Sequence, residues 1–166
     1  MKLLKIFLAC FVLSISLIGI YSRMFAQDKK ISKKNVPQAV LNSFHKTYPK
    51  AVIKGMSTET EKGKTYFEIE SVDGNVNRDL LYTATGKVAE IEETIPSSEL
   101  PKMSMKLIEK KFPSAKIEKA ERNISGSKVT YELAITAKNG KFVVVLNKEG
   151  KLIKSQKASA EESDGD

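Results

Sequence analysis

The chain of 166 residues has no tryptophan, one cysteine and one histidine, and these shortages exclude several kinds of site. Cys10 lies near the start of an N-terminal apolar run, whereas a lipid-bearing cysteine would follow such a run, and no second cysteine is present to form a disulfide. His45 falls on a predicted helix without the further ligands that a transition metal needs. No glycine-flanked serine occupies a strand-to-helix turn, so a Ser-His-Asp relay is not indicated. We therefore expect no catalytic residue, no metal and no cofactor, and predict that the protein is not an enzyme.

The N-terminus has the anatomy of a secretory signal peptide. A basic start is followed by an almost uninterrupted apolar run from Ile6 to Tyr21, which is shorter than the roughly 20 residues of a membrane-spanning helix. Ala26 is a small residue before a polar start, so we predict cleavage after Ala26 and a periplasmic or secreted protein without a stable membrane anchor. Retention of residues 1–26 as an anchor is the alternative, because Met24 is large for its place two residues before the cleavage point.

The charge of the chain does not indicate a nucleic-acid partner. The sequence holds 28 basic and 20 acidic side chains, a net charge of +8. Of the 28, Lys2, Lys5 and Arg23 lie before the predicted cleavage point, which leaves 25 basic against 20 acidic side chains, or about +5. The remaining lysines are interspersed with glutamates along predicted strands and form no basic stripe. We therefore expect no nucleic-acid binding.

The sequence repeats itself at a constant offset of 64 residues, which indicates two copies of one structural unit. Only the turns Asp73-Gly74 and Asn139-Gly140 differ, by 66, and hairpin loops tolerate such a shift. The segments that match in register are Val36-Pro37 with Leu100-Pro101, Phe44 with Ile108, Tyr48-Pro49 with Phe112-Pro113, Ala51 with Ala115, Ile53 with Ile117, Phe67-Glu68-Ile69 with Tyr131-Glu132-Leu133, and Gly86-Lys87 with Gly150-Lys151. The predicted division is a signal peptide at 1–26, a linker at 27–35, a first repeat at 36–95, a linker at 96–99, a second repeat at 100–156 and a disordered acidic tail at 157–166.

Each repeat is predicted to contain one amphipathic helix followed by four strands. Pro49 and Pro113 end the two helices, and Pro37 and Pro101 are expected in their first turns, where a missing amide hydrogen has no partner. Turn signals then recur every 10 to 14 residues between runs rich in β-branched and aromatic residues. Among them, Asp73-Gly74-Asn75 is better explained as a type I′ hairpin turn than as part of a calcium loop.

The predicted fold class is therefore α+β, a tandem repeat of a helix packed on a four-stranded antiparallel meander sheet. The two sheets lie side by side or form one continuous curved sheet. Phe44 and Ile108 hold the same position in the two repeats, so we expect both to be buried.

This arrangement resembles the PepSY-like, β-lactamase-inhibitor-like (BLIP-like) family of exported bacterial proteins. The resemblance covers residues 36–156 and consists of core and turn residues, without a catalytic signature. It implies a protein without known catalysis, and the β-lactamase-inhibitor architecture implies a sheet that grips a partner protein. The residues that carry it in the first repeat are Val36, Pro37, Phe44, Tyr48, Pro49, Ala51, Phe67, Glu68, Asp73, Gly74, Gly86 and Lys87.

Strand alternation divides the side chains between two faces of the predicted sheet. Phe67 and Ile69 should point at the helix, and residues one step out of phase should line the face without a helix. A tyrosine and exposed aliphatic residues among acidic groups suit the binding of a protein or peptide outside the cytoplasm. The residues predicted to bind it are Tyr66, Glu68, Glu70, Asp79 and Leu81 in the first repeat and Thr130, Glu132, Val143 and Val145 in the second.

Other interpretations of the same residues stay open. Glu68, Glu70, Glu90, Glu92 and Glu93 are read as solvated side chains that face cross-strand lysines, because the calcium-loop pattern is absent. Val143 and Val145 need cover, either from contact between the two units or from a partner. The predicted function is an exported binding module, with inhibition of an exported enzyme as one form of it. The alternative is a small-ligand carrier or hydrolase with a pocket between helix and sheet.

Overall fold

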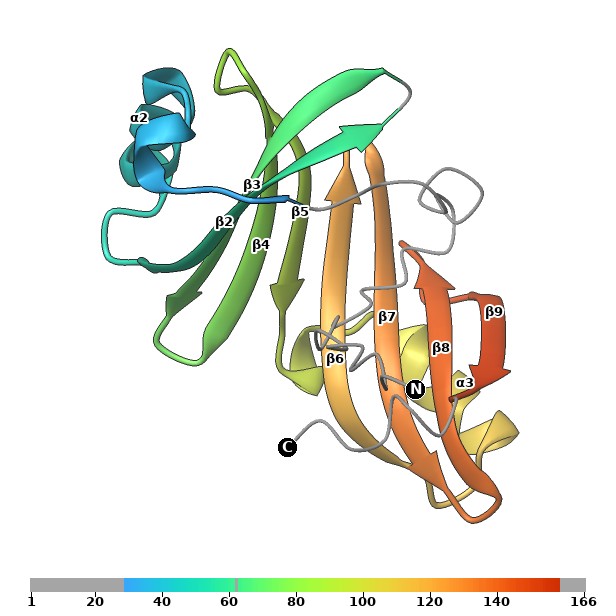
Figure 1. Cartoon of the computed structure of the whole chain (residues 1–166). Coiled ribbons are helices and arrows are strands. Elements are labelled where there is room, and N and C mark those ends of the chain that lie inside the picture. Colours follow the sequence, from blue (N-terminus) through green and yellow to red (C-terminus); the bar gives the residue numbers. More distant parts are fainter. Residues whose placement is uncertain (1–28, 62, 159–166) are drawn as a thin grey trace, which may run out of the picture.

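The computed structural model describes residues 29–61 and 63–158, which fold into one antiparallel sheet and two α-helices (Figure 1). Each strand pairs with its neighbours in sequence, so the order across the nine-stranded sheet runs from β1 to β9. The α+β class is confirmed, and the strands form one continuous sheet instead of two separate ones. The predicted signal peptide lies outside the described residues. The elements are β1 (Lys29–Lys30), α2 (Gln38–Thr47), β2 (Val52–Glu61), β3 (Lys64–Asp73), β4 (Val76–Thr83), β5 (Val88–Thr94), α3 (Lys102–Lys111), β6 (Lys116–Ser125), β7 (Lys128–Ala137), β8 (Gly140–Asn147) and β9 (Leu152–Lys157).

Both α-helices begin directly after a proline. Pro37 and Pro101 were expected inside the first turn, but each is the N-cap, with an extended ψ of 137° and 139°. This position suits proline because its carbonyl accepts an early helical hydrogen bond, from Val40 at 3.0 Å and from Ser104 at 2.8 Å, while its missing N–H costs nothing there. A short 3₁₀ helix precedes each proline, at Lys33–Asn35 and Ser97–Glu99.

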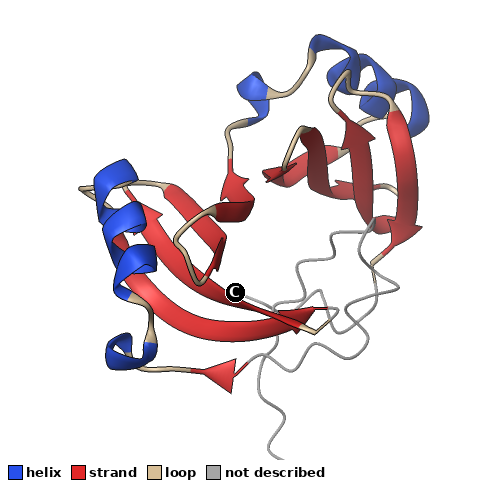
Figure 2. Cartoon of the chain, turned by 90° about the horizontal axis from the view of Figure 1, so that it is seen from above, coloured by secondary structure: helices blue, strands red, loops and turns tan. Residues whose placement is uncertain are grey.

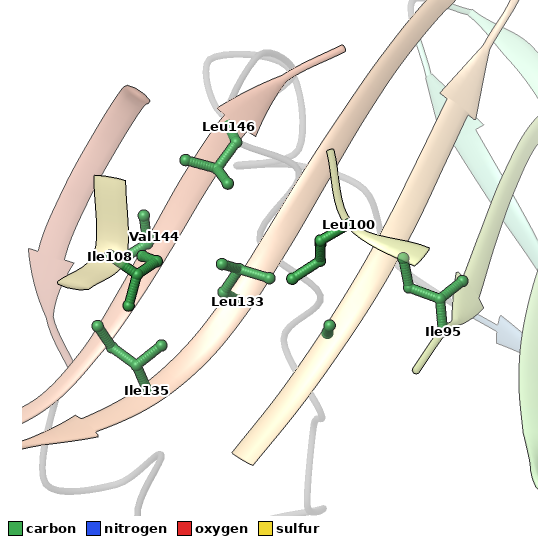
Figure 3. Packing of buried hydrophobic residues seen from close by; sticks show 8 residues of the cluster. Ile95, Leu100, Ile108, Leu133, Ile135, Val144 and Leu146 are labelled. Atoms are coloured by element: carbon green, nitrogen blue, oxygen red, sulfur yellow. The ribbon is translucent and has the colours of Figure 1, made fainter. Parts of the chain in front are cut away.

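Each helix packs on the same face of the sheet and closes its own hydrophobic core. Phe44 of α2 and Ile108 of α3 are buried, which confirms that they occupy equivalent places. Figure 3 shows Ile108 against side chains of β7 and β8 in the second core. The buried residues of the first core are Val36, Val40, Leu41, Phe44, Ile69, Leu80 and Tyr82, and those of the second are Ile95, Leu100, Ile108, Ala120, Leu133, Ile135, Val144 and Leu146.

One glycine in each unit allows the helix to approach a turn of the sheet. These turns follow β4 in the first unit and β8 in the second. Gly86 has a φ of 81°, and a Cβ there would lie 2.4 Å from the carbonyl oxygen of Ala39 in α2. Gly150 has a φ of 80°, and a Cβ there would lie 2.6 Å from the hydroxyl of Ser104 in α3. Any other residue would be strained at both places, so the repeated Gly-Lys motif has a packing cause.

The two units are joined edge to edge by β5 and β6. Residues Glu90 to Thr94 of β5 pair with Ser125 to Glu121 of β6. Figure 2 shows that the sheet curves, with the helices on the outer side and the helix-free face along the inside of the curve. Because β7 separates β8 from this joint, contact between the units does not cover Val143 and Val145, which was one of the two kinds of cover considered for them.

Three local features differ from the sequence prediction. Lys29–Lys30 forms a short strand that pairs with β2, inside the predicted linker. Lys157 still belongs to β9, so the predicted acidic tail begins too early, and residues 159–166 lie outside the described part of the chain. In the two-residue turn after Asp73 only Gly74 has a positive φ, of 59°. That pattern fits a type II′ turn and not the predicted type I′ turn, which needs a positive φ at both central residues.

Candidate partner-binding face

All nine side chains predicted to bind a partner lie on the helix-free face of the sheet. In β3, Phe67 and Ile69 pack in the core under α2, so Tyr66, Glu68 and Glu70 point to the opposite face. Residues paired across antiparallel strands share a face, and the register carries this assignment over the whole sheet. The remaining six are Asp79 and Leu81 on β4, Thr130 and Glu132 on β7, and Val143 and Val145 on β8. Their role in binding stays a prediction.

A row of polar side chains crosses the middle of this face. Glu70 pairs with Asp79, Asp79 with Glu92, Glu92 with Asn123, and Asn123 with Thr130. We call Glu70, Asp79 and Glu92 the acidic ladder. Neighbouring strands lie about 4.8 Å apart, so the ladder sets three carboxylates in line on consecutive strands. The sequence prediction included Glu70, Asp79 and Thr130 but missed Glu92 and Asn123, which lie between them.

A glycine provides the space for the first carboxylate of the acidic ladder. Gly55 of β2 pairs with Glu70 across the strands, beside an irregularity in the register of β2. A Cβ at Gly55 would lie 2.6 Å from a carboxylate oxygen of Glu70, so the Glu70 carboxylate occupies the space above the glycine. The sequence offered a signal for this contact, because a glycine inside a strand often marks a bulge or a close approach.

Burial and mutual repulsion raise the pKa values of two ladder carboxyls. Burial is the largest cause for Asp79, followed by the charges of Glu70 and Glu121, and together they raise its pKa to about 6. Burial is also the largest cause for Glu92, followed by Glu121, Asp79 and Glu132, and its pKa rises to about 8. Glu92 was predicted to be a solvated residue facing a lysine, but it is half-buried, and Glu121, Asp79 and Glu132 lie near it in addition to Lys119.

One basic side chain lies close to the acidic ladder. Lys119 of β6 forms an ion pair with Glu121 at 2.6 Å and lowers the pKa values of Asp79 and Glu92. Burial alone would lower the pKa of Lys119, but its hydrogen bond to Glu121 and the charges of Glu121, Glu92 and Asp79 raise it. Lys119 therefore stays protonated at neutral pH, and its charge is shared among several carboxylates.

Asn123 presents an unsatisfied hydrogen-bond acceptor to the same row. The residue is 8% exposed, and its Oδ1 is buried without a hydrogen-bond partner. Its cross-strand neighbours on the helix-free face are Glu92 and Thr130. A buried acceptor without a partner costs about 1–3 kcal/mol, so a donor supplied by a binding partner would be stabilising here.

The aliphatic residues of this face are more buried than the sequence predicted. Leu81 is 9% exposed and Val145 is 4% exposed, although both were expected to be open to solvent. Across the strands, Glu68 and Glu90 flank Leu81. On a curved sheet the hydrocarbon parts of such long side chains cover a smaller apolar neighbour. The accessible part of the face is therefore mainly polar.

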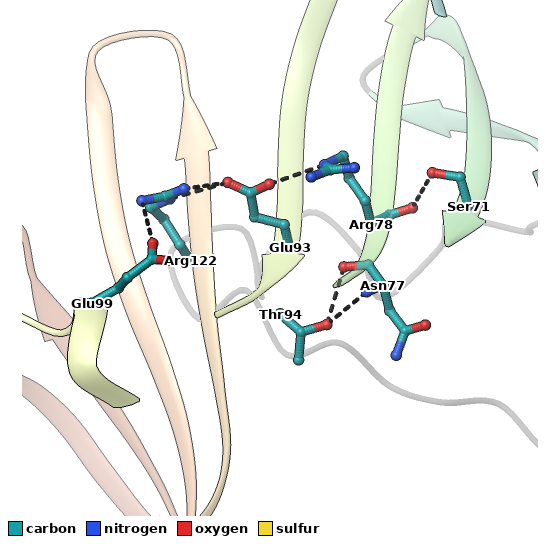
Figure 4. A network of polar contacts seen from close by, with 7 residues as sticks. All are labelled: Ser71, Asn77, Arg78, Glu93, Thr94, Glu99 and Arg122. Atoms are coloured by element: carbon teal, nitrogen blue, oxygen red, sulfur yellow. Dashed lines mark hydrogen bonds and ion pairs between the residues drawn. The ribbon is translucent and has the colours of Figure 1, made fainter. Parts of the chain in front are cut away.

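The opposite face carries a chain of ion pairs between the two helix-covered cores (Figure 4). The Nε of Arg78 donates to Glu93 at 2.9 Å, and a terminal nitrogen of Arg122 donates to the other oxygen of Glu93 at 2.5 Å. Arg122 also reaches Glu99 at 3.5 Å, and the Arg78 guanidinium lies over the ring of Tyr48 at 4.4 Å. Glu93 was predicted to be solvated, but it links β4 to β6 across the joint between the units.

Within residues 29–61 and 63–158, no group of three or more His, Cys, Asp and Glu side chains has the geometry to hold a metal ion. Neither α-helix of the described chain is long and apolar enough to span a membrane.

Comparison with known proteins places this fold among solved bacterial structures. A family model described as "Putative beta-lactamase-inhibitor-like, PepSY-like" matches the chain twice, over residues 19–90 and 65–154. A protein described as "putative periplasmic" from Bacteroides eggerthii DSM 20697 is 14% identical over 73% of this chain and 88% of its own, with a TM-score of 0.59. A BLIP-like protein from Bacteroides fragilis NCTC 9343 is 15% identical over 72% and 84%, with a TM-score of 0.53. No curated protein matches the chain.

Proposed function

We propose that this chain, which belongs to the PepSY-like family of β-lactamase-inhibitor-like proteins, is an exported, non-enzymatic module that binds a protein or peptide through the helix-free face of its sheet. The observation that carries the proposal is the curved polar face, on which a row of acceptors runs from β3 to β7 without a helix to cover it. Inhibition of an exported enzyme is one form that such binding takes, and the fold shared with a BLIP-like protein supports it.

Export is supported by the N-terminal sequence and by the fold shared with a protein described as periplasmic. The basic start, the apolar run and Ala26 form a secretory signal, so the partner should reside in the periplasm or outside the cell. Mass spectrometry of the exported protein is expected to find Gln27 as its first residue. A mature chain that retains residues 1–26 would show an anchored protein instead.

A binding module agrees better with the cores than a carrier or hydrolase does. The space between α2 and the sheet is filled by Phe44, Ile69, Leu80 and Tyr82, all fully buried. A small-ligand carrier or a hydrolase with a pocket between helix and sheet would need some of this volume. The helix-free face offers an accessible surface without disturbing either core.

Site-specific photo-crosslinking in the producing cell tests the proposed face. A photoreactive phenylalanine analogue is placed at Tyr66, on the helix-free face, and in a matched variant at Met103 of α3, which is 55% exposed on the opposite side. The Tyr66 variant is expected to form a discrete crosslinked complex in the envelope or secreted fraction, and the Met103 variant is not. Complexes from Met103 alone, or equally from both, would contradict a helix-free binding face.

A further inference from the structure

The part of the helix-free face formed by β3 to β5 carries negative charge, although the whole chain is basic. The whole chain has a net charge of +8. Strands β3 to β5 nevertheless direct Glu68, Glu70, Asp79, Glu90 and Glu92 to this one face. The basic residues of these three strands are Lys64, at the start of β3, and Arg78, which points to the opposite face and pairs with Glu93. A cationic ligand is therefore attracted to this face against the repulsion of the whole chain.

Asn123 identifies the type of hydrogen-bonding group that is missing from this face. Its Oδ1 is an acceptor, more than nine-tenths buried and without a partner, and it continues the row of the acidic ladder. Once the three carboxyls are ionised, they and the amide oxygen of Asn123 offer acceptors only. The complementary ligand carries donors and positive charge, as a lysine ammonium group with three donors and an arginine guanidinium group with five donors do.

The spacing of these acceptors favours a polypeptide over a metal ion. From Glu70 on β3 to Asn123 on β6 the row crosses three strand intervals, or about 14 Å. The ligands of one hard cation all lie within about 2.6 Å of it, and no group of acidic side chains among the described residues has that geometry. Several positive side chains on one extended segment match a row of this length.

We propose that the acidic ladder and Asn123 receive the lysine and arginine side chains of an extended, basic segment of the partner protein. This inference rests on the proposed function and names the chemistry of its partner. The raised pKa values of Asp79 and Glu92 agree with it, because a cation that approaches these carboxyls favours their ionised forms. Binding of the segment is therefore accompanied by release of protons near neutral pH.

Titration of the purified full chain with a decalysine peptide tests the proposal. Saturable binding is expected, and it should weaken by roughly tenfold or more between about 50 and 300 mM salt. The double variant Glu70→Gln/Asp79→Asn should bind the peptide roughly tenfold more weakly. The matched control Glu109→Gln/Glu149→Gln loses the same two charges from exposed positions off this face and should stay within about twofold of wild type. Asn123→Ala, which leaves the charge unchanged, should weaken binding about threefold.

Several results would overturn the proposal. Equal weakening by the two double variants would show attraction to net charge and not to the ladder. If micromolar Ca²⁺ displaces the decalysine peptide, and also binds to the chain when no peptide is present, the face is a cation site instead. If decalysine does not bind but Tyr66 still forms crosslinks, the helix-free face remains an interface and the basic segment is ruled out. Lack of both would remove the proposed function as well.

Discussion

Glu92 and Glu93 are consecutive residues of β5 whose carboxyls lie on opposite faces of the sheet and titrate in opposite directions. Glu92 faces Asp79, Glu121 and Glu132, and burial together with their charges raises its pKa to about 8. Burial would also raise the pKa of Glu93, but hydrogen bonds from Arg122 and Arg78 outweigh it and lower the value. Neighbouring residues of one strand point to opposite faces, so the charge of Glu92 is unfavourable whereas that of Glu93 forms a structural ion pair.

The free energy of unfolding should reveal this difference at Glu92. Its pKa is higher in the folded chain than the usual 4.5, so its ionisation opposes folding increasingly as the pH rises from about 4.5 to about 8. Glu92→Gln removes that cost and should stabilise the protein by about 1–3 kcal/mol at pH 8.5, with little effect at pH 5. Denaturant unfolding at the two pH values measures it. A variant less stable than wild type at pH 8.5 would show that Glu92 acts mainly as a partner of Lys119.

The two repeat-equivalent core residues provide a second prediction. Phe44→Ala should lower the free energy of unfolding by about 3–5 kcal/mol and Ile108→Ala by about 2–5 kcal/mol, because each leaves a cavity between helix and sheet. Denaturant melts of both variants measure the losses. Losses below about 1 kcal/mol in either variant would be incompatible with a buried site at that position.

At the residue scale, alternation and repetition in the sequence predict which face a side chain occupies but not how far it is removed from water. Phe44, Ile108 and the nine residues of the helix-free face were placed correctly. The burial of Leu81 and Val145 and the raised pKa of Glu92 were not predicted, because they follow from the curvature of the whole sheet. Glu93 forms ion pairs with two arginines because β5 pairs with β6. No local sequence pattern predicts that strand pairing.

At the scale of elements, the joint between β5 and β6 depends on Glu93. Its carboxylate accepts hydrogen bonds from Arg78 on β4 and Arg122 on β6, and all three side chains are largely withdrawn from solvent. Glu93→Gln leaves the guanidinium group of Arg78 without this counter-charge and leaves Arg122 with only the more distant Glu99, so it should cost about 2–4 kcal/mol. The pKa of Glu93 is lower in the folded chain than in the unfolded chain, so this loss should appear above about pH 4.5 and vanish as the pH falls further.

Glu99→Gln provides the matched control for that prediction. Glu99 contacts the same Arg122, but at 3.5 Å and with half of its side chain exposed, so its removal should cost less than about 1 kcal/mol. Urea unfolding at pH 7 compares the two variants. Equal costs for Glu93→Gln and Glu99→Gln would contradict the assignment of the joint to Glu93.

The ends of the helices were more predictable than their beginnings. Tyr48 and Phe112 are C-caps directly before Pro49 and Pro113, as the sequence predicted, since proline cannot continue a helix. The beginnings were placed too early, because Pro37 and Pro101 were expected inside the first turn and proline suits the N-cap as well. The strand β1 was missed because two lysines have little strand propensity, and only its pairing with β2 defines it.

At the scale of the whole molecule, the repeated units should unfold together because one sheet runs through both. The chain has no tryptophan, so a single introduced tryptophan reports on one unit alone. Phe67→Trp and Phe142→Trp place that reporter against the first and second cores. The two urea midpoints, each corrected by circular dichroism of the same variant, should agree within about 0.2 M. Separate midpoints would show two units that fold independently despite the shared sheet.

The resemblance drawn from helix, proline, strand and glycine positions is confirmed by the match to the PepSY-like family model. It extended to the repeat and to the α+β class because these depend on periodicity and turn residues. It left open whether the two sheets lie side by side or form one curved sheet, since edge-to-edge joining of the units leaves no motif in the sequence. The acidic ladder is also beyond such patterns, because its carboxyls are brought together from separate strands.

Methyl NMR along one strand tests the central claim, that the helix-free face binds the partner, most directly. Val144 points into the core under α3, and its neighbours Val143 and Val145 point to the helix-free face. The full chain with labelled valine and methionine methyl groups is titrated with the protein crosslinked through Tyr66. Signals of Val143 and Val145 should shift, while those of Val144 and of Met103 on α3 should not. Shifts at Met103 with Val143 and Val145 unchanged would contradict that claim.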